Sequence, residues 1–285
     1  VAIGLNALGA DTLGSRSTAL GYQALATQNF TTATDSYNTA VGYHAGLEVT
    51  TGTFNCLFGS QAGDAMTTAL GNVAIGTDSQ GANTASDKNV SVGNNTLASL
   101  NHTDGTDAYN TAVGHQAGLQ VTTGFYNTLI GGLAGDALTD ADQNVAIGVS
   151  ALTTDTLGSK STAVGNNTLA AQNFTTATDS HNTAVGYNAG AAVTTGTQNT
   201  FIGGLAGDAT TTTSDNVAIG YFALSAASGG TNVAVGSQVL ANCTGYDNTA
   251  MGQTAGNALT SGHNNLFLGH DAGRTGSPGG WFRFC

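Results

Sequence analysis

The sequence predicts an all-β protein built as a parallel β-solenoid, or β-roll, of about sixteen stacked 17-residue coils. A phrase of the form Asn-x-Ala-(Val/Ile)-Gly-x-x-Ala recurs sixteen times, as in residues 38–45 and 182–189. Self-similarity at a short fixed period is typical of equivalent units that stack and are stabilised by their neighbours. Antiparallel arrangements fit less well, because every unit carries the same phrase in the same direction.

The composition favours strands and turns over helices. Forty-two glycines, one proline and 8% charged residues match neither a disordered chain nor a collagen, which needs glycine at every third position. Thr, Asn and Gly dominate, and no apolar stripe keeps a 3.6-residue period for long. With disorder, collagen and helix disfavoured, the composition indicates short β-strands separated by polar turns.

Each unit is expected to contain one strand, one glycine bend and a polar return. Asn-Thr-Ala-Val-Gly alternates as a strand of four or five residues does, and its glycine suits a bend or a close backbone approach. The Asn side chains are expected to hydrogen-bond from layer to layer. Segments 50–53 and 194–197 are interpreted as turns or second strands, and segments 31–36 and 175–180 as bulged loops.

A longer period overlies the short one. The spacing between units rises from 17 to 21 residues at positions 17, 89 and 161, which are 72 residues apart, so four units form a super-repeat. Charged residues share this period: Arg16, Lys88 and Lys160; Asp35, Asp107 and Asp179; Asp64, Asp136 and Asp208. Duplication of a four-unit block explains the pattern, and the alternative is that every fourth layer presents the same contact surface.

The thinness of such a coil predicts an oligomer. We expect the large apolar residue before each glycine to be buried together with a Leu, which offsets little of the backbone entropy of ordering a coil. The recurring small residues, mainly Ala, would then form a face at which several chains pack around one axis. The sequence therefore predicts a homo-oligomer.

The chain is expected to consist of a repeat shaft, residues 1–273, and a non-repeat tail, residues 274–285. It opens on Val1 in mid-repeat, where an Asn should precede, so it is interpreted as a fragment of a longer protein. Cys56 is expected to be a small strand residue, Cys243 to lie in a turn, and the terminal Cys285 to be able to cross-link chains.

Charge and hydropathy restrict the partners. A formal net charge of −12 with only five Lys and Arg argues against nucleic acid, because phosphate binding needs clustered cations. No apolar run approaches the roughly 18 residues of a membrane span, so membrane insertion is not expected.

No catalytic, cofactor-binding or metal-binding residues are predicted. The carboxylates recur by duplication and are expected to be solvated rather than to converge in a cleft. The six histidines share no ligand spacing, and the glycine-rich segment 131–135 lacks the Lys and Ser/Thr of a phosphate loop.

Aromatic residues that follow the repeated glycine are the candidates for surface contact. If that position faces solvent, the side chains form a sparse ladder suited to stacking on sugar rings. The alternative is packing between coils or between chains. The candidates are Tyr22, Tyr43, Tyr187 and Tyr221, together with Phe222.

Over essentially the whole chain the repeats resemble the shaft repeats of bacteriophage tail fibres, most clearly in segments 38–46 and 199–207. This resemblance implies a homotrimeric virion protein whose repeats often precede a self-cleaving chaperone domain. Segments 72–76 and 216–220 are also similar to the head repeats of trimeric autotransporter adhesins, whose repeats are shorter. That resemblance implies an extracellular protein at a bacterial cell surface.

The expected function is therefore that of a structural and host-attachment fibre without enzymatic activity. A rigid rod would hold a binding tip away from the particle and touch a host surface glycan or receptor weakly and many times. A bacterial adhesin or extracellular filament is the alternative. A polysaccharide-degrading solenoid enzyme would need a carboxylate cluster that interrupts the repeat, and ice binding would need Thr rows of constant length.

Overall fold

The structure, a computed structural model, describes residues 1–273. The chain divides into two compact units, Val1–Gln143 and Asn144–Cys285. The described residues contain β-strands of two or three residues, turns and bends, and no helix.

Every coil contributes one strand to a sheet, and two of the long coils, each with the coil before it, add a second short strand. Unit 1 contains β1 (Ala2–Ile3), β2 (Gly14–Ser15), β3 (Thr18–Leu20), β4 (Thr34–Asp35), β5 (Thr39–Val41), β6 (Cys56–Phe58), β7 (Val73–Ile75), β8 (Val90–Val92), β9 (Thr111–Val113) and β10 (Thr128–Ile130). Unit 2 contains β11 (Val145–Ile147), β12 (Gly158–Ser159), β13 (Thr162–Val164), β14 (Thr178–Asp179), β15 (Thr183–Val185), β16 (Thr200–Ile202), β17 (Val217–Ile219), β18 (Val233–Val235), β19 (Thr249–Met251) and β20 (Leu266–Leu268).

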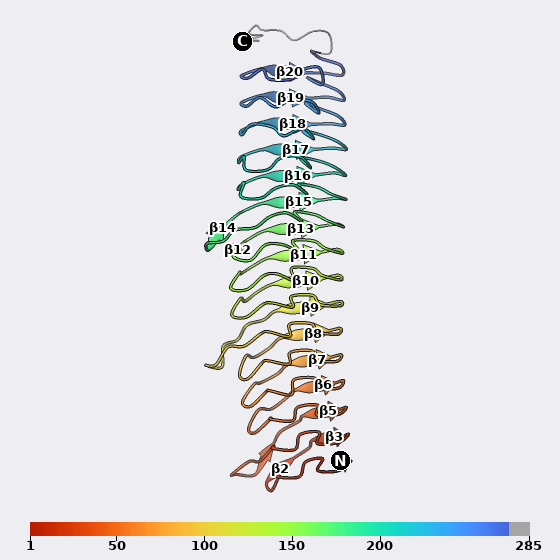
Figure 1. The fold of residues 1–285 in the computed structure, drawn as a ribbon, viewed down its shortest axis with the longest axis vertical. Coiled ribbons are helices and arrows are strands. Elements are labelled where there is room, and N and C mark those ends of the chain that lie inside the picture. Colours follow the sequence, from red (N-terminus) through yellow and green to blue (C-terminus); the bar gives the residue numbers. More distant parts are fainter. Residues whose placement is uncertain (274–285) are drawn as a thin grey trace. The chain divides into compact units, whose positions relative to one another are not determined.

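Within each unit the strands of successive coils pair in parallel and in register (Figure 1). Ala40 of β5 is opposite Leu57 of β6, which is opposite Ala74 of β7, and the same one-to-one pairing continues from coil to coil. The chain is thus a parallel β-solenoid of about sixteen turns spaced about 17 residues apart, which confirms the predicted fold class.

The repeated glycine is required by the close approach of neighbouring coils. Gly42 has a φ of 143°, a conformation that only glycine adopts readily, and a Cβ atom there would lie 2.2 Å from the carbonyl oxygen of Gly59. The predicted role of this glycine is confirmed.

The predicted asparagine ladder is also present. The backbone N–H of Asn55 donates to Oδ1 of Asn38 at 2.9 Å, and that of Asn72 donates to Oδ1 of Asn55 at 3.0 Å. The Nδ2 of most of these buried Asn residues also crosses its own coil, as from Asn55 to the carbonyl oxygen of Ala69 at 2.7 Å. Such a side chain connects the start of a strand both to the next coil and to its own return segment.

The 21-residue coils are more regular than bulged loops. In the first and last of them, β4 pairs in parallel with β2 of the preceding coil, and β14 with β12 in the same way. At the long coil that begins at residue 89, Asp87 and Asp107 form an isolated parallel bridge. The prediction of loops over 31–36 and 175–180 therefore missed a second short ladder. The extra residues allow this ladder because they give the coil a second short segment that pairs with the preceding coil before the chain reaches its next strand.

The structure reverses the predicted inner and outer faces. Ala40 and Ala74, in the middle of their strands, are fully buried, whereas Ile75, which precedes Gly76, is 36% exposed. Side chains of a strand alternate between its two sides, so a three-residue strand points only its middle residue into the coil. The small residues line the core, and the larger apolar residues before the glycines face outward.

The two described cysteines lie in different environments. Cys56 lies in β6 as predicted and is exposed, and Cys243 is buried just after a turn. Cys285 and the tail that begins at residue 274 lie outside the described residues. Residues 1–273 include no helix that could cross a membrane.

Candidate functional site

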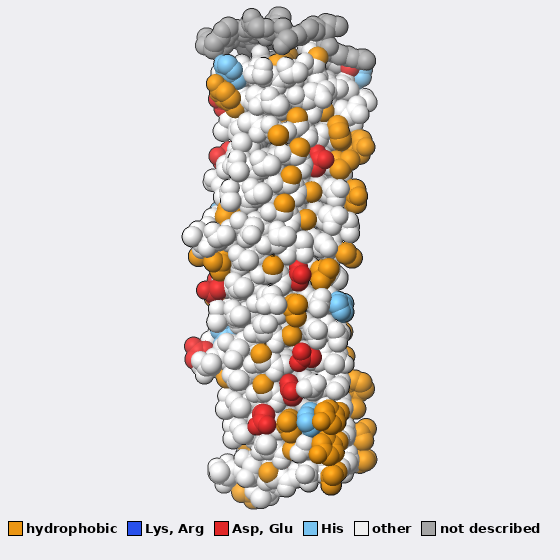
Figure 2. Space-filling model, viewed as in Figure 1, with side chains coloured by type: hydrophobic (Ala, Val, Ile, Leu, Met, Phe, Trp, Pro, Cys, Tyr) orange, Lys and Arg blue, Asp and Glu red, His pale blue; other side chains and the backbone are white. Residues whose placement is uncertain are grey.

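The outward side of each sheet is an exposed apolar face. Its main row is the residue before each repeated glycine, with Phe58 and Ile130 exposed in unit 1 and Ile202 and Met251 exposed in unit 2. Figure 2 shows hydrophobic side chains (orange) on the surface of both units and no Lys or Arg (blue) on the face it draws, outside the grey residues. Because each coil adds a further apolar side chain, the face grows with the number of coils.

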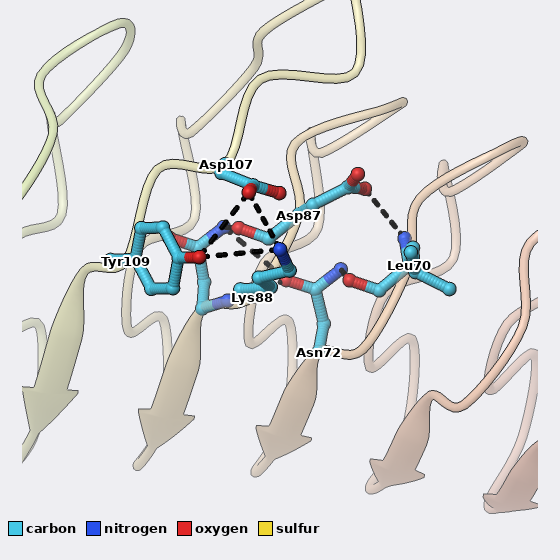
Figure 3. Close-up of polar contacts among 7 residues, drawn as sticks. Leu70, Asn72, Asp87, Lys88, Asp107 and Tyr109 are labelled. Carbon is cyan, nitrogen blue, oxygen red and sulfur yellow. Dashed lines mark hydrogen bonds and ion pairs between the residues drawn. The ribbon is translucent and has the colours of Figure 1, made fainter.

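A second surface feature is a cluster around Lys88 at a long coil (Figure 3). Its Nζ donates to Oδ2 of Asp107 at 2.6 Å and to the hydroxyl of Tyr109 at 3.2 Å, and it lies 5.3 Å from the Tyr109 ring centroid. The hydrogen bond between the two charges raises the pKa of Lys88 and lowers that of Asp107. The ion pair connects the long coil to the coil before it. Both side chains remain solvent-exposed, so its contribution to stability is small.

Asp87, in the same cluster, plays a different part. Its carboxylate turns away from Lys88 and accepts the backbone N–H of Leu70 at 2.6 Å (Figure 3). Burial raises the pKa of Asp87, and the hydrogen bond from Leu70 opposes this shift. Asp87 therefore joins two neighbouring coils.

The cluster recurs with the 72-residue period. Arg16 pairs with Asp35 at 3.2 Å and stacks over Tyr37 at 5.3 Å, and Lys160 pairs with Asp179. The duplicated charges are thus ion pairs across the long coils, and the three aspartates are exposed as expected.

Asp64 and Asp208 are only partly solvated, unlike the expectation for the duplicated aspartates. Burial raises the pKa of both carboxyls, and the negative charge of Asp78 adds to the shift of Asp64. Oδ1 of Asp208 is buried without a hydrogen-bond partner among the described residues. Within residues 1–273 no group of three or more His, Cys, Asp and Glu is arranged to hold a metal ion.

The four candidate tyrosines are all exposed, but they form two different arrangements. Tyr22 and Tyr43 lie in adjacent coils of unit 1 and stack, with ring centroids 5.5 Å apart and planes 9° apart. His44 stacks in turn on Tyr43 at 3.8 Å. Tyr43 therefore already stacks on two other rings.

Tyr187 and Tyr221 lie two coils apart in unit 2, with Gly204 at the corresponding position between them. The backbone N–H of Leu205 donates to Tyr187 O at 2.8 Å, and that of Phe222 donates to Gly204 O at 3.0 Å. These bonds extend the coil register past the repeated glycine. The two rings therefore flank a position that has no side chain.

Sequence reasoning missed a second aromatic row, one residue before the asparagine ladder. Tyr37 stacks on Phe54 with centroids 5.3 Å apart, and Tyr109 stacks on Tyr126 at 5.9 Å. The signal was available, since each of these residues directly precedes a repeated Asn.

These features make a surface of apolar, aromatic and paired charged rows among the described residues. Comparison with protein-family models, with curated proteins and with solved structures finds no match for this chain.

Proposed function

We propose that the chain is a shaft segment of a structural attachment fibre, of the kind found in bacteriophage tail fibres, and that it acts as a homotrimer in a virion. The exposed apolar face of the sheets carries this proposal. Soluble proteins rarely leave a large contiguous apolar surface open to water, and such a surface usually marks an interface.

The periodicity of the face supports further copies of the same chain as its partner. One apolar side chain is presented per coil, at the roughly 4.8 Å spacing of a parallel ladder. Only a partner with the same rise per layer can stay in contact over many layers, and a second copy of the chain meets that condition. Rotational symmetry about an axis along the strand stack would bring the face of every copy to the centre.

Three copies are favoured by the resemblance of the repeats to tail-fibre shafts. The function is then mechanical: a stiff shaft carries a binding tip, and weak polar and aromatic contacts repeated along its outer surface attach to host polysaccharide by multivalency.

Light scattering after size exclusion tests the proposal. The expected mass is three times that of the 28.2 kDa chain. Ile75→Lys or Ile219→Lys places a charge in the apolar face and should shift the protein to a single-chain mass with an unchanged circular dichroism spectrum. Gln120→Lys, at an exposed position away from that face, should leave the trimer intact. A single-chain mass for the unaltered protein would overturn the proposal.

A further inference from the structure

We propose that Tyr187, Gly204 and Tyr221 form a binding slot for one neutral pyranose ring of a host glycan, held between the two tyrosine rings. The inference deepens the proposed attachment function, on which it rests. The inference specifies one binding site in one row of side chains, whereas the proposed attachment function does not specify a site.

The backbone fixes the three residues in one column. Val185, Ile202 and Ile219 are opposite one another in the parallel strands β15, β16 and β17. The three proposed slot residues each follow two positions later, and the hydrogen bonds Leu205 N to Tyr187 O and Phe222 N to Gly204 O keep that register. Two ladder steps of about 4.8 Å therefore separate the two tyrosines.

The middle coil carries no side chain between the two tyrosines, because its residue is Gly204. A Cβ atom on Gly204 would have one non-neighbouring heavy atom within 4 Å, Cδ2 of Tyr221 at 3.7 Å, which is ordinary contact. Both tyrosines are strongly exposed, Tyr187 at 59% and Tyr221 at 57%. In the single chain the slot is thus bordered by Tyr221 and accessible from solvent.

The width suits a single ring. Tyr22 and Tyr43 occupy the same position in adjacent coils, and they stack at a centroid distance of 5.5 Å with nearly parallel planes. Tyrosines in this row can therefore lie flat against a ring one coil away. A ring placed over Gly204 would lie about one ladder step from the backbone of each tyrosine, and the Tyr221 ring, which already reaches toward Gly204, would be in contact with it.

The chemistry of the row selects the ligand. Asn166, Tyr187, Gly204, Tyr221 and Ser237 are successive members of this row, and none is charged. Aromatic faces carry negative partial charge, so they attract the C–H groups on the face of a sugar ring. They provide no favourable contact for the negative charge of an anionic sugar. A ring with only equatorial substituents presents C–H groups on both faces, which a two-sided clamp requires. The structure therefore points to β-linked glucosyl units rather than sugars with an axial hydroxyl.

The test uses the full chain and titrates it with cellohexaose, followed by saturation-transfer NMR and calorimetry. Mannohexaose, whose axial hydroxyl blocks one face of each ring, serves as the contrasting probe. We expect cellohexaose to bind at one site per chain and at least about fivefold more tightly than mannohexaose, the gain expected from one additional aromatic contact.

Gly204→Tyr should abolish this binding, because the new ring would fill the slot. The backbone at Gly204 does not have positive φ, and tyrosine is native at the same position in four other coils, so this variant is expected to fold. Gly204→Ala leaves room for the ligand and should retain binding. Tyr187→Ala and Tyr221→Ala should each weaken it about fivefold to tenfold, while Tyr43→Ala, in an already stacked pair, should have no effect.

Equal binding by Gly204→Tyr and the unaltered protein would overturn the slot, as would binding of neither probe by the unaltered protein. Preference for a free aromatic ring such as indole over cellohexaose would overturn the sugar assignment. The mass of the assembly is measured on the same samples. A trimer that does not bind cellohexaose would contradict the slot but not the fibre proposal. A single-chain mass, together with cellohexaose binding that Gly204→Tyr abolishes, would contradict the fibre proposal but not the slot.

Discussion

The side chain of Leu57 fills the space that Gly46 leaves open in the preceding coil. A Cβ atom on Gly46 would lie 2.7 Å from Cδ1 of Leu57 and 2.9 Å from Cδ2 of Leu25. Gly63, in the same coil as Leu57, makes room for its other methyl group, with a Cβ-to-Cδ2 distance of 2.9 Å. One large residue and two glycines therefore form a single packing unit.

This packing unit recurs in every fourth coil and gives the super-repeat a physical basis. The large residue always stands in the middle of a strand, and a glycine stands four residues after the repeated glycine of its own coil and of the coil before. The other sets are Leu129 with Gly118 and Gly135, Phe201 with Gly190 and Gly207, and Phe267 with Gly256 and Gly273.

Gly46→Ala should destabilise unit 1 by about 2–4 kcal/mol. The methyl group overpacks the core against Leu57, and Gly46 has a φ of 60°, which costs an alanine a further kcal/mol or so. Chemical denaturation measures the change. Gly132→Ala is the matched control, because a Cβ there meets nothing within 4 Å, and it should shift the free energy of unfolding by less than about 0.5 kcal/mol.

A double-mutant cycle separates the clash from the backbone cost. Leu57→Ala alone should cost about 2–5 kcal/mol through the cavity it leaves. In the background of Leu57→Ala, the substitution Gly46→Ala should cost only its backbone share, so the two effects should not add. Full additivity would show that the two residues do not share one space.

The repeat phrase was sufficient to predict the solenoid, its parallel direction and its asparagine ladder, because all three follow from identical units stacked in the same direction. It could not predict which side of the strand faces inward. Ala40 and Val41 are adjacent in β5 and point to opposite sides of the strand. Either side would give an apolar interior, lined by small side chains in one case and by large ones in the other. The space available inside one coil decides between them, and that space depends on the return segment.

The candidate site was predictable only in part. The position of Tyr187 and Tyr221 after the repeated glycine could be read as an exposed row, but the open position between them depends on the register of the coil at Gly204. The cluster at Lys88 depends on pairing across a 21-residue coil, which the sequence presents as an irregular insertion.

Asn72→Ala should remove about 2–6 kcal/mol of stability. Oδ1 of Asn72 accepts the backbone N–H of Asn89 at 2.9 Å, and its Nδ2 donates to Ser86 O at 2.9 Å. Both partners are buried, so the substitution leaves two polar groups unsatisfied, at about 1–3 kcal/mol each. Thermal unfolding measures the loss.

Asn94→Ala is the control for the ladder. Asn94 is exposed, and its side chain makes one long hydrogen bond, 3.4 Å to Thr77 O. Its removal should change stability by less than about 0.5 kcal/mol. Equal effects of the two substitutions would mean that the ladder contributes no more than a surface contact.

Asp64 should make the folded state less stable as the pH rises. Burial, with the negative charge of Asp78, raises the pKa of Asp64 above its ordinary value of 3.8, so the folded state holds this proton more tightly than the unfolded state. The contribution to stability is present below pH 3.8 and is lost as the pH rises through the folded-state pKa. Asp64→Asn should therefore stabilise the protein at pH 7, by less than about 1 kcal/mol because the carboxyl is half-exposed.

Asp107→Asn should show the opposite sign in the same series of denaturation curves. The hydrogen bond from Lys88 lowers the pKa of Asp107, so its contribution is present above the ordinary pKa of 3.8 and is lost as the pH falls through the folded-state pKa. Asp107→Asn should weaken the protein at pH 7 and not in acid. The same pH dependence for both variants would contradict the assignment of the two shifts.

Gly42→Ala should lower the stability of the protein far more than an alanine at a positive-φ glycine whose Cβ position is free. The new Cβ would lie 2.2 Å from the carbonyl oxygen of Gly59, which is backbone and cannot turn aside. We expect a loss on the order of 4 kcal/mol or more, seen as a fall in soluble yield and melting temperature. Gly105→Ala isolates the conformational share, because Gly105 has a φ of 74° and nothing within 4 Å of its Cβ position. That variant should lose only about 1 kcal/mol. If both alanines cost the same, the contact between coils at Gly42 would not be what requires glycine in every repeat.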